Sequence, residues 1–238
     1  MPKKKASSHG LSMGLLLRIA DIDQGIERDG PNAGLSAVYI HMAGCQLDCW
    51  YCESADERGD ERAITSVVIE INNMRGRTQV GDKPLCVLTG GDPMMQKIGP
   101  FVETLLGHGW KVQVETHGEE WTDLPDSEDL ELVCSPKSSK VHTFVKSRAT
   151  AWRYMIREAD DYERRDGLPV CNTQRIDGSR EPVTKPTRGR PVWLQPVTEE
   201  GVTGKNMRAA RSRAMEYGYR YAGPRIVERG RVTDRLLD

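Results

Sequence analysis

The 238-residue sequence lacks three features that would mark whole classes of function. It has no excess of either charge, with 34 lysine and arginine residues against 35 aspartate and glutamate residues, so electrostatics does not favour nucleic acid or a membrane surface as a partner. It has no apolar run of the roughly 20 residues that a membrane span requires. Residues 1–10 also lack the apolar stretch of a secretory signal. We therefore expect a cytoplasmic protein that acts on a small molecule.

Internal repeats and low-complexity blocks are also absent, which excludes repeat architectures. The length suits one domain with a substantial core. We expect a disordered, solvated tail over residues 1–10 and a single domain over residues 11–238. Within that domain, residues 157–190 are rich in Arg, Asp, Gly, Pro and Thr and show no sustained period, which predicts a long loop or insertion.

The sequence does contain an alternation of short apolar runs with segments of helical period, which predicts an α/β fold with a parallel sheet. The predicted strands are residues 37–42, 85–89, 111–115, 130–134, 152–156 and 192–195, with residues 14–19 as a candidate edge strand. Apolar side chains at helical spacing predict helices between residues 64 and 74, 98 and 105, and 207 and 217. The last helix is expected to stop at Gly218.

Three of the six cysteines, Cys45, Cys49 and Cys52, form a CxxxCxxC pattern directly after a predicted strand. In the cytosol thiols stay reduced, so cysteines in such a pattern are expected to bind metal or to act in catalysis. The remaining cysteines stand alone. Two of them, Cys86 and Cys134, lie in apolar runs where cysteine is usually a small core residue.

The CxxxCxxC pattern allows two kinds of metal site. Structural zinc requires four closed ligands, and here His41 is the candidate for the fourth, since no second CxxC pair occurs. A four-iron, four-sulfur cluster ordinarily takes four thiolates, so three thiolates leave one iron open to bind a cofactor or substrate. We favour the iron-sulfur cluster. A non-catalytic iron-sulfur or zinc module is the alternative from another functional class.

The cysteine pattern, with the aromatic Tyr51 before the last cysteine, resembles the signature of the radical S-adenosylmethionine (SAM) superfamily. The resemblance implies that SAM chelates the open iron and that the cluster passes one electron to its sulfonium, which releases methionine and a 5′-deoxyadenosyl radical. It also implies a partial (βα)6 barrel of the TIM type, with fewer helices than strands.

Short polar motifs follow the later predicted strands, namely TGGDP at residues 89–93, ETHG at 115–118, SPK at 135–137 and LQP at 194–196. Such groups lie at the carboxyl ends of parallel strands, where open sheets and barrels bind ligands. In this order the motifs are similar to those of the 7-carboxy-7-deazaguanine synthases of queuosine and deazapurine biosynthesis. The resemblance covers most of the chain.

This second resemblance implies a ring-contracting lyase. The adenosyl radical would take hydrogen from carbon 6 of 6-carboxy-5,6,7,8-tetrahydropterin, and the ring would contract to 7-carboxy-7-deazaguanine with loss of ammonia and regeneration of SAM. The resemblance assigns SAM to Tyr51, Gly90, Gly91, Asp92, Ser135 and Lys137, the pterin to Gln24, Asp29, His41, Glu115, His117 and Gln195, and Mg²⁺ to Ser54. It further implies a homodimer that receives electrons from a flavodoxin or ferredoxin.

Two site residues depart from the family pattern. His41 stands where the family has an arginine that pairs with the substrate carboxylate, and a histidine cannot form an arginine's bidentate fork. Asp92 replaces a glutamate and is one methylene shorter. Residues 157–190 and 219–238 have no counterpart that we can align. A divergent member, of the sort that viral genomes carry for DNA base modification, would show such changes.

One rival enzyme class fits part of the sequence. Asp29, Gly30 and Pro31 resemble the DGPG segment of glycyl-radical activating enzymes, whose substrate is a backbone glycine of another protein. The SPK and LQP segments favour the synthase.

Overall fold

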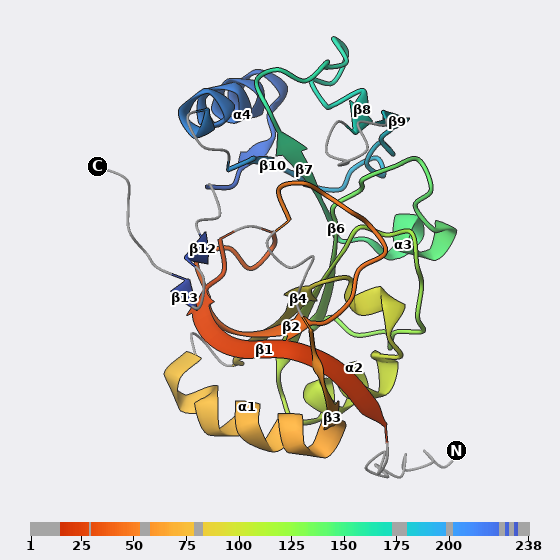
Figure 1. Ribbon diagram of the computed structural model, residues 1–238, viewed down its shortest axis with the longest axis vertical. Coiled ribbons are helices and arrows are strands. Elements are labelled where there is room, and N and C mark those ends of the chain that lie inside the picture. The colour runs from red at the N-terminus through yellow and green to blue at the C-terminus, as the bar shows by residue number, and fades with distance from the viewer. Residues whose placement is uncertain are drawn as a thin grey trace, which may run out of the picture.

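The computed structural model describes residues 15–28, 30–52, 58–78, 83–172, 180–198 and 202–223, together with two short strands near the end, β12 (Val227–Glu228) and β13 (Arg231–Val232). The predicted tail at residues 1–10 lies outside the described residues, as do Asp29 and Ser54. In the described part, a nine-stranded, mostly parallel sheet runs through the molecule, with helices packed against it (Figure 1).

Six parallel strands, adjacent in the same order as in the sequence, form the middle of the sheet. They are β2 (Ser36–Met42), β4 (Leu85–Gly90), β5 (Lys111–Thr116), β6 (Leu130–Cys134), β7 (Ala151–Ile156) and β10 (Val192–Pro196). Their bounds agree with the six predicted strands to within one residue at each end. The predicted α/β class with a parallel sheet is therefore confirmed.

Three further strands complete the sheet. β1 (Leu16–Ile26) pairs antiparallel with β2, β3 (Asp60–Ala63) pairs antiparallel with β1, and β11 (Arg220–Tyr221) pairs parallel with β10. The predicted edge strand at 14–19 covers only the beginning of β1. Strand β1 continues to Ile26 because its polar second half bonds to β2 along the whole stretch, which an apolar pattern does not reveal.

The three predicted helices are present as α1 (Ile64–Thr78), α2 (Gly99–Gly107) and α4 (Thr203–Tyr217). Helix α4 ends before Gly218, which takes the left-handed conformation expected of a helix stop (φ 72°). A fourth helix, α3 (Thr143–Arg148), was not predicted because six residues are too few to show a period. The connection from β5 to β6 is described throughout and contains no helix.

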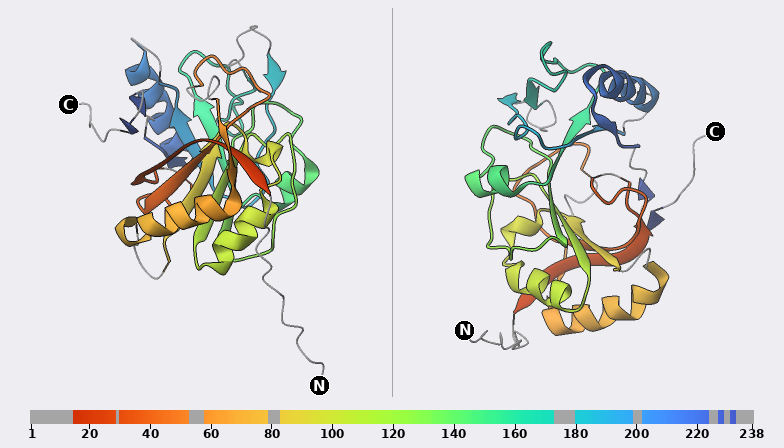
Figure 2. Two further views of the ribbon diagram at one scale, coloured as in Figure 1. Left: turned by 60° about the horizontal axis from the view of Figure 1, so that its bottom comes forward. Right: turned by 180° about the vertical axis from the view of Figure 1, so that it is seen from behind.

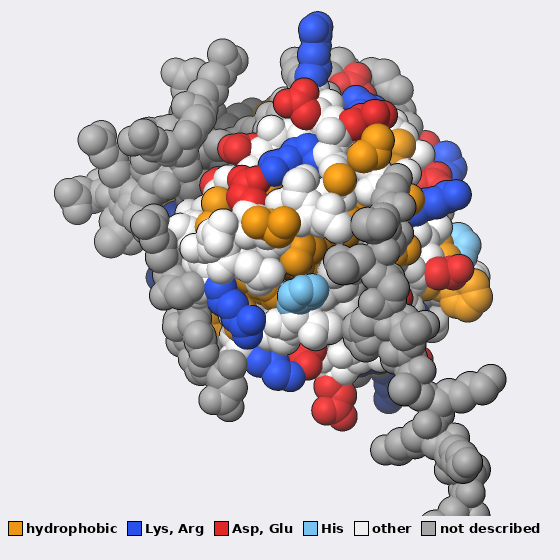
Figure 3. Space-filling view, turned by 90° about the horizontal axis from the view of Figure 1, so that it is seen from below, with side chains coloured by type: hydrophobic (Ala, Val, Ile, Leu, Met, Phe, Trp, Pro, Cys, Tyr) orange, Lys and Arg blue, Asp and Glu red, His pale blue; other side chains and the backbone are white. Residues whose placement is uncertain are grey.

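The helices cover one face of the sheet. Figures 1 and 2 show α1 and α2 beside each other on one side, while α4 packs next to β10 at the other end of the strand order. Between sheet and helices lies the main core, which includes Ile40, Leu88, Phe101 and Trp110. Over α1 and α2 the described surface mixes both signs of charge with scattered apolar side chains (Figure 3). None of the described helices has the length and apolar character to cross a bilayer.

Between β7 and β10, where the sequence predicts a long loop, the described residues form turns and short pairings. Tyr162 and Pro169 make an isolated bridge, and β8 (Cys171–Asn172) pairs antiparallel with β9 (Glu181–Pro182). Outside this segment, the short strands β12 and β13 pair with each other.

The chain offers a matched test of the main core, because it has only two phenylalanines. Phe101 in α2 is fully buried, whereas Phe144 in α3 is 55% exposed. We expect Phe101→Ala to lower the free energy of unfolding by about 3–5 kcal/mol, through lost burial and a cavity. Phe144→Ala should lower it by less than about 1 kcal/mol. Chemical denaturation measures both, and equal effects would contradict this assignment of the core.

Candidate active site

The three cysteines lie on one loop, residues 43–52, which we call the cysteine loop. The chain leaves β2 and turns at Gly44, whose φ of 91° is readily adopted only by glycine. Cys45 Sγ accepts a hydrogen bond from the Leu47 backbone N–H (3.4 Å), and the Cys52 N–H donates to the carbonyl of Cys49 (2.9 Å). All three cysteines are free of disulfides; Cys49 is buried and the other two are partly exposed.

The Gly-Gly pair at the end of β4 packs against the start of the cysteine loop. The Gly91 N–H donates to the carbonyl of Met42 (2.7 Å), and the Asp92 N–H donates to the carbonyl of Gly44 (2.9 Å). A Cβ on Gly91 would lie 2.1 Å from the Gly44 oxygen, and a Cβ on Gly90 would lie 2.7 Å from the Met42 nitrogen. The two glycines therefore allow a backbone contact that no larger residue permits.

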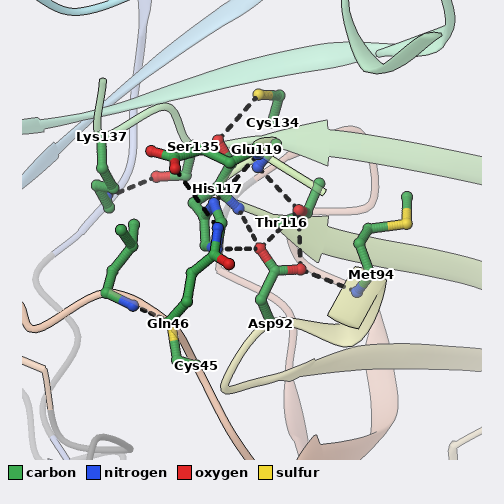
Figure 4. Close-up of polar contacts among 12 residues, drawn as sticks. Cys45, Gln46, Asp92, Met94, Thr116, His117, Glu119, Cys134, Ser135 and Lys137 are labelled. Atoms are coloured by element: carbon green, nitrogen blue, oxygen red, sulfur yellow. Dashed lines mark hydrogen bonds and ion pairs between the residues drawn. The ribbon is translucent and has the colours of Figure 1, made fainter. Parts of the chain in front are cut away.

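Asp92 joins the ends of β4 and β5 from a fully buried position. One carboxylate oxygen, Oδ1, accepts from the Met94 N–H (2.9 Å) and from Thr116 Oγ1 (2.9 Å). The other, Oδ2, is 2.8 Å from Thr116 Oγ1, accepts from the His117 N–H (3.0 Å) and lies 2.8 Å from His117 Nε2 (Figure 4). Protein donors alone thus satisfy this buried carboxylate.

His117 lies between Asp92 and the cysteine loop. Burial lowers the pKa of His117, but the contacts with Asp92 and Cys45 outweigh it and raise the pKa to about 9. In the neutral ring, Nδ1 accepts the Glu119 N–H (3.2 Å). Protonation would break that bond while strengthening the pairing with Asp92. His117 therefore connects the polar cluster around Asp92 to the first cysteine of the loop.

A row of polar side chains crosses the face of the sheet opposite the main core. We call His41, Thr89, Glu115 and Arg153 the polar row. His41 and Thr89 are register partners on β2 and β4, and Thr89 Oγ1 donates to Glu115 Oε2 (2.8 Å). Both Nη1 and Nη2 of Arg153 lie 3.3 Å from that same oxygen. The row therefore runs across β2, β4, β5 and β7, and it lies near the carboxyl ends of the first three strands.

Two buried amide side chains, Gln113 and Asn32, extend the hydrogen bonds of the polar row. Gln113, two residues before Glu115 on β5, donates from Nε2 to Glu115 Oε1 (3.2 Å). Its own Oε1 accepts from Asn32 Nδ2 (2.9 Å), which belongs to the turn between β1 and β2. Both amide residues are buried. The Glu115 carboxylate is consequently held in place by groups on both of its oxygens.

The SPK segment after β6 reaches the cysteine loop. Lys137 Nζ donates to Ser135 Oγ (3.0 Å) and lies 5.7 Å from the centre of the Tyr51 ring. Burial disfavours the charged form of both side chains. It lowers the pKa of Lys137 to about 8 and raises the pKa of the Tyr51 hydroxyl. The structure thus brings together three of the residues that the sequence assigns to SAM.

Other predicted residues lie apart from these groups. Gln24 pairs in register with Val38 of the main core and donates to the carbonyl of Met74 in α1 (3.2 Å), so it lies on the helix side of the sheet. His41 Nε2 is 3.5 Å from Asp23 Oδ1. Gln195 is buried in β10. The roles predicted for these residues, and for Asp29 and Ser54, stay predictions.

Sequence reasoning missed several residues of this site. Arg153 lies in an apolar run, AWRYMI, which predicts only a buried strand. The alternation of strand side chains was the available signal, because it places Arg153 on the face opposite Trp152 and Tyr154 of the main core. Thr116 belongs to the ETHG motif, yet the motif alone does not show that its hydroxyl bonds to Asp92.

The donors of the cysteine loop fit an iron-sulfur cluster. Among the described residues, no three His, Cys, Asp or Glu side chains converge as a site for a single metal ion. The loop nevertheless supplies three cysteines within eight residues, none of them in a disulfide, and thiolates are the usual ligands of iron-sulfur clusters.

Comparison with known proteins identifies the family. A 7-carboxy-7-deazaguanine synthase from Rhodospirillum rubrum is 34% identical over 211 residues, which cover 86% of this chain and 88% of that protein. This chain belongs to the 7-carboxy-7-deazaguanine synthase family. The family resemblance drawn from the sequence motifs is thereby confirmed.

Two further comparisons extend over similar lengths. A 7-carboxy-7-deazaguanine synthase from Hyperthermus butylicus is 28% identical and matches 85% of this chain and 86% of its own. The crystal structure of QueE from Escherichia coli has the same fold, with a TM-score of 0.61 over 87% of this chain and 93% of that chain, at 16% identity. No family model matches the chain.

The close approach at Gly91 predicts a specific effect on this synthase-family site. We expect Gly91→Ala to lower the free energy of unfolding by about 1–3 kcal/mol, because its Cβ would clash with the Gly44 oxygen. The displaced cysteine loop should also bind less iron during anaerobic reconstitution. Gly204→Ala is the control, since a Cβ there meets only Arg208 Nη1 at 3.7 Å in a helix. Normal stability and iron content in Gly91→Ala would contradict the prediction.

The buried Asp92 carboxylate gives a second test. Asp92→Asn keeps one acceptor oxygen but turns an NH₂ group toward the donors of Thr116, Met94 or His117. We expect the free energy of unfolding to fall by about 1–3 kcal/mol. Asp123→Asn, at an exposed position, should change it by less than about 0.5 kcal/mol. Thermal or chemical denaturation distinguishes the two, and a neutral Asp92→Asn would refute the bonding described here.

Proposed function

We propose that this chain converts 6-carboxy-5,6,7,8-tetrahydropterin to 7-carboxy-7-deazaguanine with loss of ammonia, as a radical SAM lyase. The observation that carries the proposal is the match over most of its length to relatives named for that product. The site agrees with it, because the cysteine loop, the Gly-Gly turn and the SPK segment lie together at the carboxyl ends of parallel strands.

Cys45, Cys49 and Cys52 would hold the four-iron, four-sulfur cluster, and SAM would bind beside it against Gly90, Gly91, Tyr51, Ser135 and Lys137. When bound, these two groups supply the 5′-deoxyadenosyl radical that begins the reaction. The chain itself contributes position and shielding. Tyr51 in the cysteine loop and Lys137 above its ring are partly buried, so they would help to shield from water the place where a radical would otherwise react unselectively.

The polar row would orient the pterin. Glu115 is buried and its carboxylate is held by Thr89, Gln113 and Arg153, so it presents a fixed charge to a ligand on that face of the sheet. Such preorganised polar groups orient a small molecule without the cost of ordering side chains during binding. His41, Gln195 and Asp29 are the further pterin contacts that we propose, with Mg²⁺ at Ser54.

The finer features of the fold belong to the same proposal. We infer that the six parallel strands curve into a partial barrel of the radical SAM type and that residues 11–238 form its single domain. The order of these strands, unbroken from β2 to β10, supports this view. A homodimer, a flavodoxin or ferredoxin as electron donor, and a cytoplasmic location complete the proposal.

One experiment tests the reaction. The purified chain is reconstituted with iron and sulfide under anaerobic conditions and supplied with SAM, Mg²⁺ and a reductant, with and without the carboxytetrahydropterin. We expect 7-carboxy-7-deazaguanine to form only with the pterin. A glycyl-radical activating enzyme would cleave SAM without making this product, and a non-catalytic module would yield no 5′-deoxyadenosine. Either result would overturn the proposal.

The cluster ligands predict a matched pair of variants. Cys45→Ser should abolish product formation and lower the iron content, because a serine hydroxyl does not replace a thiolate on iron. Cys171→Ser removes a partly exposed free thiol outside the cysteine loop and should leave both quantities unchanged. Iron analysis and product assay measure the effects. Full activity in Cys45→Ser would show that the cluster is held elsewhere.

A further inference from the structure

Helix α4 carries an unbalanced positive charge. The whole chain has nearly equal numbers of acidic and basic residues, but α4 has one acidic residue, Glu216, against four basic ones, Lys205, Arg208, Arg211 and Arg213. The side chains of Lys205, Arg208 and Arg211 are exposed, and none of them forms an ion pair with another residue that the structure describes. Their spacing of three residues places them on one side of the helix. We call these three residues the basic face.

The beginning of α4 lies at the same edge of the sheet as the cysteine loop. The helix follows β10 after a short connection, so its first turns lie near the carboxyl ends of the parallel strands (Figure 1). The buried side chain of Asn206 fixes this arrangement. Its Nδ2 donates to the carbonyl of Val197 after β10 (3.0 Å), and its Oδ1 accepts from the Glu158 N–H after β7 (2.8 Å). Lys205 and Arg208 flank Asn206 in the helix.

The segment after β7 also contacts the cysteine loop. Arg157, the neighbour of Glu158, has its guanidinium carbon 5.1 Å from the centre of the Trp50 ring. Trp50 lies between the last two cysteines of the loop and is 36% exposed. Asp160 lies 3.8 Å from Arg157 and balances part of its charge, so the excess positive charge of this region comes from α4. One short segment thus connects the basic face to an exposed ring of the cysteine loop.

This arrangement suits a protein that delivers an electron. The proposed reaction requires one electron for the cluster from outside the chain, and the surface at Trp50 lies next to the proposed cluster ligands. Interfaces with electron carriers are small and weak, and complementary charge speeds the encounter of the two proteins. Positive charge also attracts nucleic acid. A position beside the cysteine loop, however, matters only to a partner that exchanges electrons with the cluster.

We propose that Trp50, Arg157 and the basic face of α4 together form the docking surface for an acidic one-electron carrier protein. This inference rests on the proposed function and names the surface through which its cluster would be reduced. One electron leaves the carrier, which is oxidised, and enters the cluster, which is reduced, and no bond forms or breaks. The supporting observation is the connection from Trp50 through Arg157 and Glu158 to the first turns of α4.

The test measures how fast a flavodoxin with an excess of surface carboxylates reduces the anaerobically reconstituted chain. Its anionic flavin hydroquinone loses one electron and becomes the neutral semiquinone, whose absorbance is followed by stopped flow. We expect Lys205→Glu combined with Arg208→Glu to lower the second-order rate constant about tenfold or more at low ionic strength. Calorimetry should show weaker binding of oxidised flavodoxin. The difference should nearly vanish at 1 M salt, where the Debye length is about 3 Å.

The chain offers a matched control for the change in net charge. Arg188 and Arg190 are exposed and lie directly before β10, at the opposite edge of the sheet. Arg188→Glu combined with Arg190→Glu should keep the flavodoxin rate within about twofold of the wild type. Reduced methyl viologen is a small cation that needs no docking surface. It should reduce every variant at least as fast as the wild type, which checks that fold and cluster are intact.

An acidic residue within the proposed surface gives a test in the opposite direction. Asp48 and Glu158 are exposed acids of the cysteine loop and of the segment after β7, and they oppose the approach of an acidic carrier. Glu158→Gln removes one of these charges and should raise the rate of reduction by flavodoxin. A rate that falls in this variant would contradict the proposed complementarity of charge.

The remaining outcomes are also decisive. Equal slowing by flavodoxin in the two double variants would show a general effect of net charge and refute the inference. An unchanged flavodoxin rate in Lys205→Glu with Arg208→Glu would also refute it. If that variant then lost affinity for a short DNA duplex in fluorescence anisotropy, the basic face would belong to nucleic acid instead.

The failure of this inference is distinguishable from the failure of the proposed function. A wild type that forms 7-carboxy-7-deazaguanine with reduced methyl viologen, but that flavodoxin neither binds nor reduces, would overturn the docking surface alone. A wild type that forms no product with either reductant would overturn the proposed function, even where flavodoxin reduces the cluster at the rates expected here.

Discussion

Two backbone hydrogen bonds, from Gly91 to Met42 and from Asp92 to Gly44, hold the end of β4 against the beginning of the cysteine loop. The contact is possible only because residue 91 has no Cβ. This contact also affects how the ends of β2, β4 and β5 are joined. Once Asp92 is placed there, its buried carboxylate binds the turn after β5, and His117 from that turn is close enough to Cys45 for the thiol to raise the pKa of the imidazole. The ends of β2, β4 and β5 thus meet beside the first cysteine.

The two faces of the sheet carry different kinds of side chain. On the helix side, apolar side chains of the parallel strands pack against α1, α2 and α4 and provide most of the buried core. On the opposite face, small apolar clusters are combined with the polar row near the carboxyl ends of the strands. Because strand side chains alternate in direction, one strand such as β7 contributes both to the core, through Trp152, and to the polar row, through Arg153. The apolar core and the polar row are therefore separated by the alternating direction of side chains along each strand.

The sequence predicted the six parallel strands well because most of them are short, largely apolar runs bounded by polar turns, a pattern that burial of both faces favours. It predicted less of β1, whose polar second half forms a strand through bonding to β2. In the site, motifs indicated which strand ends would gather, and the structure brings Tyr51, Ser135 and Lys137 together. Motifs did not indicate partners across strands. The pairs Asp92–His117 and Glu115–Arg153 depend on register and side-chain direction, which a single sequence does not specify.

The substitution of aspartate for glutamate at residue 92 is best understood through these partners. A carboxylate one methylene shorter remains close to its own backbone, where it accepts from the Met94 N–H and bonds to Thr116 and His117. An ionised carboxylate has about four lone-pair sites, and the donors around Asp92 already occupy both of its oxygens. A contact between the Asp92 carboxylate and the amino group of SAM would therefore compete with its bonds to Met94, Thr116 and His117. In this chain the carboxylate of residue 92 joins the turns that follow β4 and β5, and an added role in cofactor binding would require one of those protein donors to give way.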